Sequence, residues 1–155
     1  MPEASKEERT QKAREWYQED VAHYISIHPE VINKKLEGIL RKLKQRFTLA
    51  LITTNTKEYI DKILENAGLQ GIYDIIHAST TKEEPSKNKI ANEFKQKYGQ
   101  PKYYVASRSK EAFEEFPKIG AICIYFAPDE INPELKGIAS KTITKYTELE
   151  QINGV

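Results

Sequence analysis

The segment Leu49-Ala50-Leu51-Ile52-Thr53-Thr54-Asn55-Thr56 decides the fold of this chain. Its first four residues are apolar, and a short apolar run that ends at turn-forming residues is typical of a buried strand. Its last four residues are hydroxyl and amide side chains of the kind that precede helices, and a helical pattern begins at Lys57. The segment therefore predicts a strand that ends in polar side chains at the start of a helix.

From residue 47 onward the chain repeats this alternation of apolar runs and helical segments. It predicts strands near 47–53, 73–78, 102–106 and 120–126, a short fifth strand at 141–145, and a final short helix capped by Thr147 with Glu150. Such alternation favours a parallel sheet with helices on both faces. We therefore predict an α/β fold, a three-layer and mostly parallel Rossmann-like sheet of four to five strands, within a single domain.

Residues 1–46 are expected to form a helical segment that packs on the α/β core of residues 47–155. Ser5 and Glu8 have the spacing of a capping box at the start of a helix that runs to about Ile25. A second helix follows Pro29 and runs to about Gln45. Each helix has an apolar stripe, which we interpret as its packing surface. The first stripe comprises Ala13, Trp16, Tyr17, Val21 and Tyr24, and the second comprises Val31, Ile32, Leu36, Ile39, Leu40 and Leu43.

Composition excludes several classes of protein. The 155 residues carry a net charge of only +1, which argues against a nucleic-acid or membrane-surface partner. No apolar stretch approaches the roughly 20 residues that span a bilayer, and the N-terminus is polar. The single cysteine, Cys123, lies in an apolar run and is expected to be a buried small side chain. These features together predict a cytoplasmic protein.

Polar side chains follow three of the predicted strands. In an open α/β sheet ligands bind beyond the carboxyl ends of the strands, and a helix N-terminus there attracts anions. These hydroxyl-rich positions suit an oxyanion, although helix capping alone also explains Thr56 and Ser109. The positions are Thr53, Thr54 and Asn55 after the first strand, Ser79, Thr80 and Thr81 after the second, and Ser107, Arg108 and Ser109 after the third.

The run from Leu49 through Gly68 to Ile76 resembles the phosphate-binding strand, helix and next strand of the haloacid dehalogenase superfamily, with the resemblance extending over about residues 29–152. It implies that Thr54 and Asn55 hold a substrate phosphate. Ser107 stands where the family has its first metal-binding carboxylate, and with Arg108 it is a candidate phosphate contact. A guanidinium binds phosphate in a bidentate way without a metal.

Two further positions bear on catalysis in such a protein. The segment Glu84-Pro85-Ser86-Lys87 occupies the place of the family's Lys-Pro signature, so Lys87 is a candidate charge-balancing lysine, with Lys82 and Lys89 as alternatives. Glu111 stands where the family has a second acidic ligand of Mg²⁺, an ion that prefers carboxylate oxygens. Surface lysines and carboxylates are the simpler interpretation of both.

The nucleophile of the family, an aspartate in an Asp-x-Asp strand, has no match between Met1 and Arg46. In the family that strand lies between the strands that correspond to residues 47–53 and 102–106. Its absence predicts either a sheet that closes up in a flavodoxin-like order or a strand supplied by another polypeptide. Two functions follow. The first is a phosphatase-like domain without self-sufficient activity that binds a phosphorylated ligand or a protein partner. The second is a Mg²⁺-dependent phosphatase completed by a separate strand.

Overall fold

The predicted strand and helix at residues 49–66 are present in the computed structural model, which describes residues 3–79 and 86–152. Strand β1 (Ala50–Thr56) runs directly into helix α3 (Lys57–Asn66). The strand continues three residues beyond the predicted end, because its parallel pairing with strand β2 (Ile75–Ser79) extends to Thr56 opposite Ser79. Thr54 and Asn55 therefore belong to the end of the strand.

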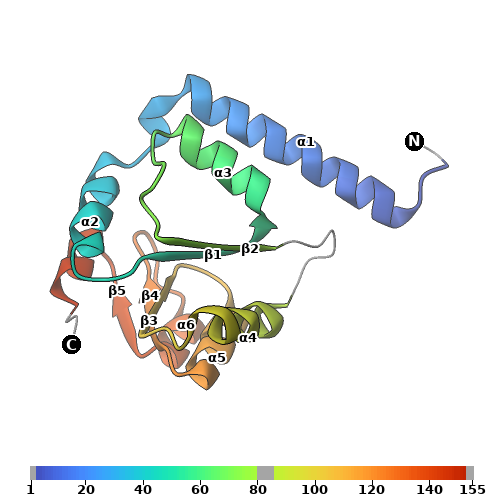
Figure 1. Ribbon diagram of the computed structural model, residues 1–155. Helices are drawn as coiled ribbons and strands as arrows, with labels where there is room; N and C mark the ends of the chain where they lie inside the picture. Colours follow the sequence, from blue (N-terminus) through green and yellow to red (C-terminus); the bar gives the residue numbers. More distant parts are fainter. Residues whose placement is uncertain (1–2, 80–85, 153–155) are drawn as a thin grey trace. The chain divides into compact units, whose positions relative to one another are not determined.

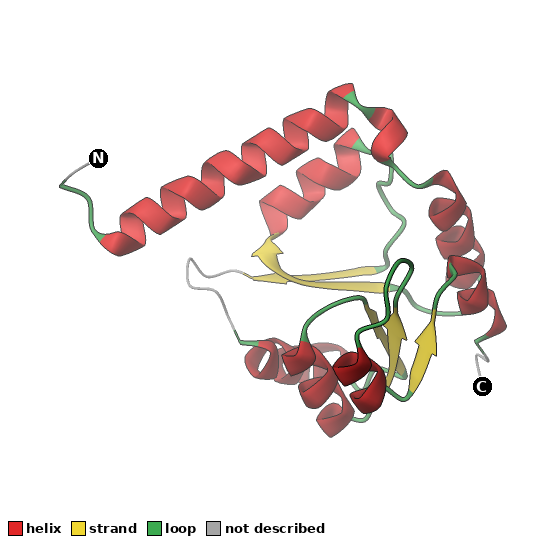
Figure 2. Ribbon diagram, turned by 180° about the vertical axis from the view of Figure 1, so that it is seen from behind, coloured by secondary structure: helices red, strands yellow, loops and turns green. Residues whose placement is uncertain are grey.

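The chain divides into two compact units, residues 1–84 and residues 85–155 (Figure 1). The boundary predicted between 46 and 47 lies inside the first unit. Besides β1, α3 and β2, the first unit contains helix α1 (Lys6–Ile27), the 3-10 helix η1 (Pro29–Val31) and helix α2 (Lys34–Lys44). Within this unit α3 lies between α1 and the two-stranded sheet in both views of the ribbon (Figures 1 and 2).

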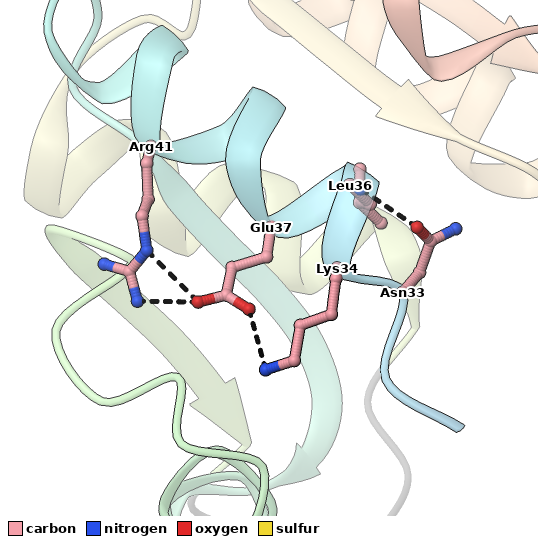
Figure 3. A network of polar contacts seen from close by, with 5 residues as sticks. All are labelled: Asn33, Lys34, Leu36, Glu37 and Arg41. Atoms are coloured by element: carbon pink, nitrogen blue, oxygen red, sulfur yellow. Dashed lines mark hydrogen bonds and ion pairs between the residues drawn. The ribbon is translucent and has the colours of Figure 1, made fainter. Parts of the chain in front are cut away.

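Polar side chains at the start and on one side of helix α2 stabilise it. The Asn33 side chain caps the helix by accepting a hydrogen bond from Leu36 N at 3.0 Å. One turn further, Glu37 accepts from both Lys34 and Arg41, at 3.2 and 2.9 Å (Figure 3). The hydrogen bond from Arg41, followed by that from Lys34, holds the pKa of Glu37 below its usual value. These polar contacts lie on the side of α2 opposite its predicted apolar stripe. In that stripe Ile39 and Leu43 are buried.

The core of the first unit lies between α3 and the sheet. Ile60 and Leu64 of α3 pack with Ile72, which is 1% exposed. The helix presents these residues because positions four apart share a face. Around them lie six partly buried residues, which are Leu40, Leu51, Tyr59, Leu69, Tyr73 and Ile76. Burial of this cluster is what positions the β1–α3 turn.

The predicted packing stripe of α1 is wrong. The side of α1 that faces α3 combines polar side chains with the half-buried Val21 and Ile25, and Ala22 is its one fully buried residue. Hydrogen bonds add to the packing there: Asn66 Nδ2 donates to Ala22 O at 2.8 Å, and Arg14 donates to Thr54 O. The aromatic stripe consequently points to solvent. Of its members Ala13, Trp16, Tyr17 and Tyr24 are exposed, and Val21 is half-buried.

Asp74 joins three segments of the first unit. Its carboxylate accepts from Leu49 N at 2.9 Å and pairs with Lys44 Nζ at 2.9 Å. Lys44 also donates to Gly71 O at 2.7 Å, so the end of α2 is tied to the start of β1 and to the turn before β2. The hydrogen bond from Leu49 N, followed by that from Lys44, holds the pKa of Asp74 below its usual value.

We expect Asp74→Asn to lower the free energy of unfolding at pH 7 and to lessen the acid sensitivity of the protein. A carboxyl with a lowered folded-state pKa stabilises the fold above its unfolded pKa of about 4, and this contribution is lost as the pH falls through the folded value. The difference from wild type should therefore shrink as the pH falls below about 4. Urea unfolding across this range measures it, with the exposed Asp129→Asn as control. A difference that is constant with pH would contradict the role given to Asp74.

The second unit contains the remaining strands in a parallel sheet of order β3-β4-β5. The central strand β4 is buried from Cys123 to Phe126, as expected for a strand covered on both faces. Helix α4 and the 3-10 helices flank the sheet together with α5 and α6. The elements are α4 (Lys87–Tyr98), β3 (Tyr103–Ala106), α5 (Lys110–Glu115), η2 (Phe116–Ile119), β4 (Ile122–Phe126), α6 (Pro133–Ile138), β5 (Lys141–Ile143) and η3 (Tyr146–Gln151).

The final helix η3 is capped by residues other than those predicted. The carboxylate of Glu148 accepts from Thr144 N at 2.9 Å and from Lys145 N at 3.0 Å. The helix begins one residue before Thr147, so the predicted pairing of Thr147 with Glu150 does not form the cap. Two backbone donors on one carboxylate lower the pKa of Glu148.

The predicted α/β class with parallel strands and flanking helices is confirmed, but the strands form two ladders. Within the described residues β1 pairs with β2 alone and β3 pairs with β4 alone. The first unit contributes the two-stranded ladder and the second unit the three-stranded one. No helix of the described ranges is both long and apolar enough to cross a membrane.

Candidate phosphate-binding site

The end of β1 is shaped by a local hydroxyl contact. Asn55 N donates to Thr53 Oγ1 at 3.1 Å, which is a Ser/Thr turn within the strand. The register with β2 is irregular between Ile52 and Thr56, and such irregularities re-aim side chains. The Thr53 hydroxyl thus accepts the hydrogen bond of the Asn55 backbone amide, while the Thr54 hydroxyl and the Asn55 carboxamide make no hydrogen bond with a described residue.

The start of α3 has no side-chain cap. Thr56 occupies the N-cap position in extended conformation, yet its hydroxyl accepts no hydrogen bond from the helix. Capping, the simpler interpretation of this hydroxyl, is therefore not its role in this structure. The first amides of a helix lack intrahelical acceptors, and they form the positive end of its dipole. This turn combines those amides with the polar end of β1, which is an arrangement that attracts an anion.

Arg14 adds a cation to this turn, and sequence reasoning did not identify it. Its Nη2 donates to Thr54 O at 2.8 Å from helix α1, forty positions earlier in the chain. A guanidinium carries five N–H donors, and the described residues give it this one contact. In the sequence the only sign of this role is helical spacing. Arg14 precedes Gln18 by four residues and Ala22 by eight, so the three lie on one side of α1.

Of the three residues predicted to supply hydroxyls after the second strand, only Ser79 lies within the described backbone. Ser79 is the last residue of β2 and lies in register with Thr56 of β1. It therefore belongs to the same end of the two-stranded sheet as Thr54. Thr80 and Thr81 lie outside the described residues, as do Lys82, Glu84 and Pro85.

Ser107 and Arg108 follow β3 in the second unit, where both side chains are exposed. Neither side chain makes a hydrogen bond or ion pair with another described residue. The next residue, Ser109, has a left-handed backbone with φ of 77°, and its hydroxyl caps α5 by accepting from Ala112 N at 3.3 Å. A non-glycine residue in this region carries strain, which the cap bond offsets in part. Ser109 is thus a capping residue.

Lys87 and Glu111 are brought together, but not as a catalytic pair. The carboxylate of Glu111 accepts from the backbone N of Lys87 at 2.9 Å, at the first residue of α4. Asn88 makes a parallel contact with Glu115 Oε2 at 2.7 Å. These bonds tie the start of α4 to α5. Glu111 therefore accepts a hydrogen bond from the first backbone amide of α4. The contact does not involve the ammonium group of Lys87.

The described residues do not fit a Mg²⁺ site. Residues 3–79 and 86–152 contain no group of three or more His, Cys, Asp or Glu side chains placed to share an ion. Mg²⁺ requires near-octahedral oxygen ligands, and the one candidate carboxylate, Glu111, is held by a backbone amide. We therefore assign no chemical step to a metal here.

Comparison with known families identifies the chain. A family model described as haloacid dehalogenase-like hydrolase matches residues 2–106, more than half of the sequence. The chain belongs to this family. Comparison with curated proteins gave no match.

The family match shows which residues carry the resemblance. It begins at residue 2 and so includes α1, whereas the motifs alone indicated a start near residue 29. It contains the whole β1–α3 turn and Arg14, and it ends at Ala106, immediately before Ser107. The haloacid dehalogenase-like part of the sequence thus includes the phosphate-binding candidates of the first unit.

Proposed function

We propose that this haloacid dehalogenase-like domain binds a phosphorylated ligand at the β1–α3 turn and lacks self-sufficient phosphatase activity. Thr54 and Asn55 supply the hydroxyl and carboxamide donors, and Arg14 supplies the positive charge. The observation that carries the proposal is the contact of Arg14 with Thr54 O at 2.8 Å. It places a cation with unused donors at the turn where family membership and helix geometry both favour phosphate.

Three features support binding without catalysis. No Asp-x-Asp strand occurs before β1 in the sequence. The Glu111 carboxylate, the candidate metal ligand, accepts a hydrogen bond from the Lys87 backbone amide. Ala106 and Ser107 stand where the family has Gly and Asp. A phosphoryl group held by hydroxyls and a guanidinium has no carboxylate nucleophile among these residues.

We expect Thr54→Ala to weaken the binding of inorganic phosphate roughly 10- to 100-fold. A hydrogen bond to a charged group contributes about 1.5–3 kcal/mol, and each 1.4 kcal/mol corresponds to a factor of ten. Thr54→Ser keeps the hydroxyl and should retain most of the affinity. Isothermal titration of the purified chain with phosphate measures this, and the exposed Thr10→Ala is the matched control.

The same proteins should be assayed for hydrolysis of p-nitrophenyl phosphate, with Mg²⁺ and with a chelator. The proposal expects no turnover above background in either condition. Chelator-sensitive turnover that is lost in Thr54→Ala would show an enzyme with a nucleophile outside the residues named here. Equal phosphate affinity in wild type and Thr54→Ala would overturn the assignment of the binding site.

A second candidate is a Mg²⁺-dependent phosphoric monoester hydrolase whose nucleophile strand comes from another polypeptide. The observation that favours it is the edge of β1 opposite β2. Ile75 N donates to Leu49 O, so by alternation the backbone groups of Ala50 and Ile52 point to the other edge. That edge has no charged side chain or proline from Ala50 to Thr56, and such an edge readily accepts an added strand.

One experiment distinguishes the two candidate functions. An apolar synthetic peptide that ends in Asp-x-Asp is mixed with the chain, and p-nitrophenyl phosphate hydrolysis is followed with Mg²⁺. Turnover that requires both peptide and chain, and that a peptide ending in Asn-x-Asn does not support, would establish the completed enzyme. No turnover together with Thr54-dependent phosphate binding would support the binding domain.

A further inference from the structure

Helix α1 carries an apolar surface on the side away from α3. Arg14 contacts the end of β1 and Ala22 contacts α3, and a rotation of 100° per residue places Gln11 and Gln18 on the same side of α1 and positions 9, 13, 16, 20, 23 and 27 on the opposite side. In both ribbon views α3 lies along one side of the C-terminal part of α1, with the sheet of β1 and β2 beyond α3 (Figures 1 and 2). We call this surface, made by Arg9, Ala13, Trp16, Asp20, His23 and Ile27 with Lys12, Glu19 and Tyr24 at its margins, the outer face of α1.

Large apolar side chains on and beside the outer face are exposed. Trp16 is 58%, Tyr24 51% and Ile27 58% exposed, and the adjacent Tyr17 is 66% exposed. Single exposed apolar side chains are ordinary on a protein surface. Several on one side of one helix gather apolar surface that a partner can cover, as at interaction sites. Tryptophan and tyrosine are also the residues that contribute most to binding at interfaces.

Charge is distributed unevenly along the same face. Arg9 and Lys12 lie N-terminal to Trp16, and Lys12 Nζ lies 6.0 Å from the centre of the Trp16 ring. Glu19 and Asp20 lie C-terminal to it. The outer face therefore has a basic half and an acidic half separated by an aromatic centre.

A second copy of the same helix complements this pattern in only one direction. When two such helices lie antiparallel with Trp16 near the centre, Arg9 and Lys12 of each copy face Glu19 and Asp20 of the other. A parallel pair would place like charges side by side and would be repelled. Antiparallel pairing also satisfies the two-fold symmetry that most homodimers use.

We propose that the outer face of α1 is the interface of a homodimer in which the two α1 helices pack antiparallel. The aromatic centre is buried between the copies, and the two charged halves set the direction of pairing. The interface is separate from the phosphate-binding turn, because Arg14 and Thr54 meet on the α3-facing side of α1.

Charge reversal tests both the surface and its direction. Arg9→Glu with Lys12→Glu makes the outer face uniformly acidic, and Glu19→Lys with Asp20→Lys makes it uniformly basic. Each double variant should raise the dissociation constant of the dimer roughly tenfold or more in sedimentation equilibrium. An equimolar mixture of the two should recover tight association, and so should the chain that carries all four changes, because antiparallel complementarity is then restored.

Control variants distinguish the loss of this interface from a general effect of surface charge. Lys35→Glu with Lys62→Glu makes the same change of charge at exposed positions of α2 and α3 and should leave association unchanged. Circular dichroism checks that each variant keeps its helices. In wild type, dilution through the dissociation constant should shift the Trp16 emission to longer wavelength. A chain that is monomeric at about 1 mM, or a dimer that both double variants leave intact, would overturn the proposal.

Discussion

Replacing Phe116 with alanine is expected to lower the free energy of unfolding by about 3–5 kcal/mol. Phe116 is 0% exposed and stacks on the ring of Tyr104, with ring centres 3.8 Å apart and planes 6° from parallel. Phe113 meets the same tyrosine edge-on at 6.4 Å and meets Tyr125 at 5.9 Å. Removing Phe116 leaves a cavity beside the Tyr104 ring, and a rigid ring cannot collapse to fill it.

Urea unfolding of wild type, Phe116→Ala and Phe116→Leu measures this loss. Typical domains are stable by only about 5–15 kcal/mol, so the milder leucine variant provides a folded protein for comparison. Burial raises the pKa of Tyr104 to about 12. We expect this pKa to fall in Phe116→Leu, because the ring becomes better hydrated, and phenolate absorbance follows it. Unfolding midpoints equal to wild type in both variants would show that the aromatic cluster does not stabilise the fold.

Some elements were predictable because a local pattern determines them. The apolar stripe of α2 has helical spacing, and its centre, Ile39 and Leu43, is buried as expected. The run from 120 to 126 became the central strand β4 because uninterrupted apolar sequence suits a strand covered on both faces. The ends of elements were less predictable. The last three residues of β1 depend on pairing with Ser79, which local sequence does not reveal.

Helix α1 shows why an apolar stripe alone is an unsafe guide to packing. Its aromatic stripe suggested a buried face, yet the packed face carries polar side chains and is held in part by hydrogen bonds to Ala22 O and Thr54 O. A polar side chain reveals its suitability for burial only when its partner is known, and both partners are forty or more residues away. The exposed aromatic residues then gain a different meaning, as an interface with a second copy.

The residues of the candidate site also differ in how far the sequence could reveal them. Thr54 and Asn55 were recognisable because the strand, the hydroxyls and the start of the helix are contiguous in sequence. Arg14 was not, because only the docking of α1 on α3 brings its guanidinium to Thr54. For Glu111 the family pattern suggested a metal ligand, while the nearest donor in the structure is the Lys87 amide.

Replacing Ile72 with alanine is expected to cost about 2–5 kcal/mol of unfolding free energy and to weaken phosphate binding at the same time. Ile72 is 1% exposed and packs with Ile60 and Leu64, the residues that seat α3. Leu51 of β1 borders the same cluster. A cavity there loosens the strand and the helix whose junction presents Thr54. Stability and affinity should therefore fall together.

A matched pair of variants separates packing from direct contact. Ile72→Val removes one methylene group and should cost about 0.5–1.5 kcal/mol with little change in phosphate affinity. Thr54→Ala should show the reverse, a loss of affinity with little loss of stability, because it removes a hydroxyl that makes no hydrogen bond with a described residue. Urea unfolding and phosphate titration on the same samples give both quantities. If Ile72→Ala lowered stability but left affinity intact, the binding site would not depend on the α3 core, and the β1–α3 turn would lose its support as the phosphate site.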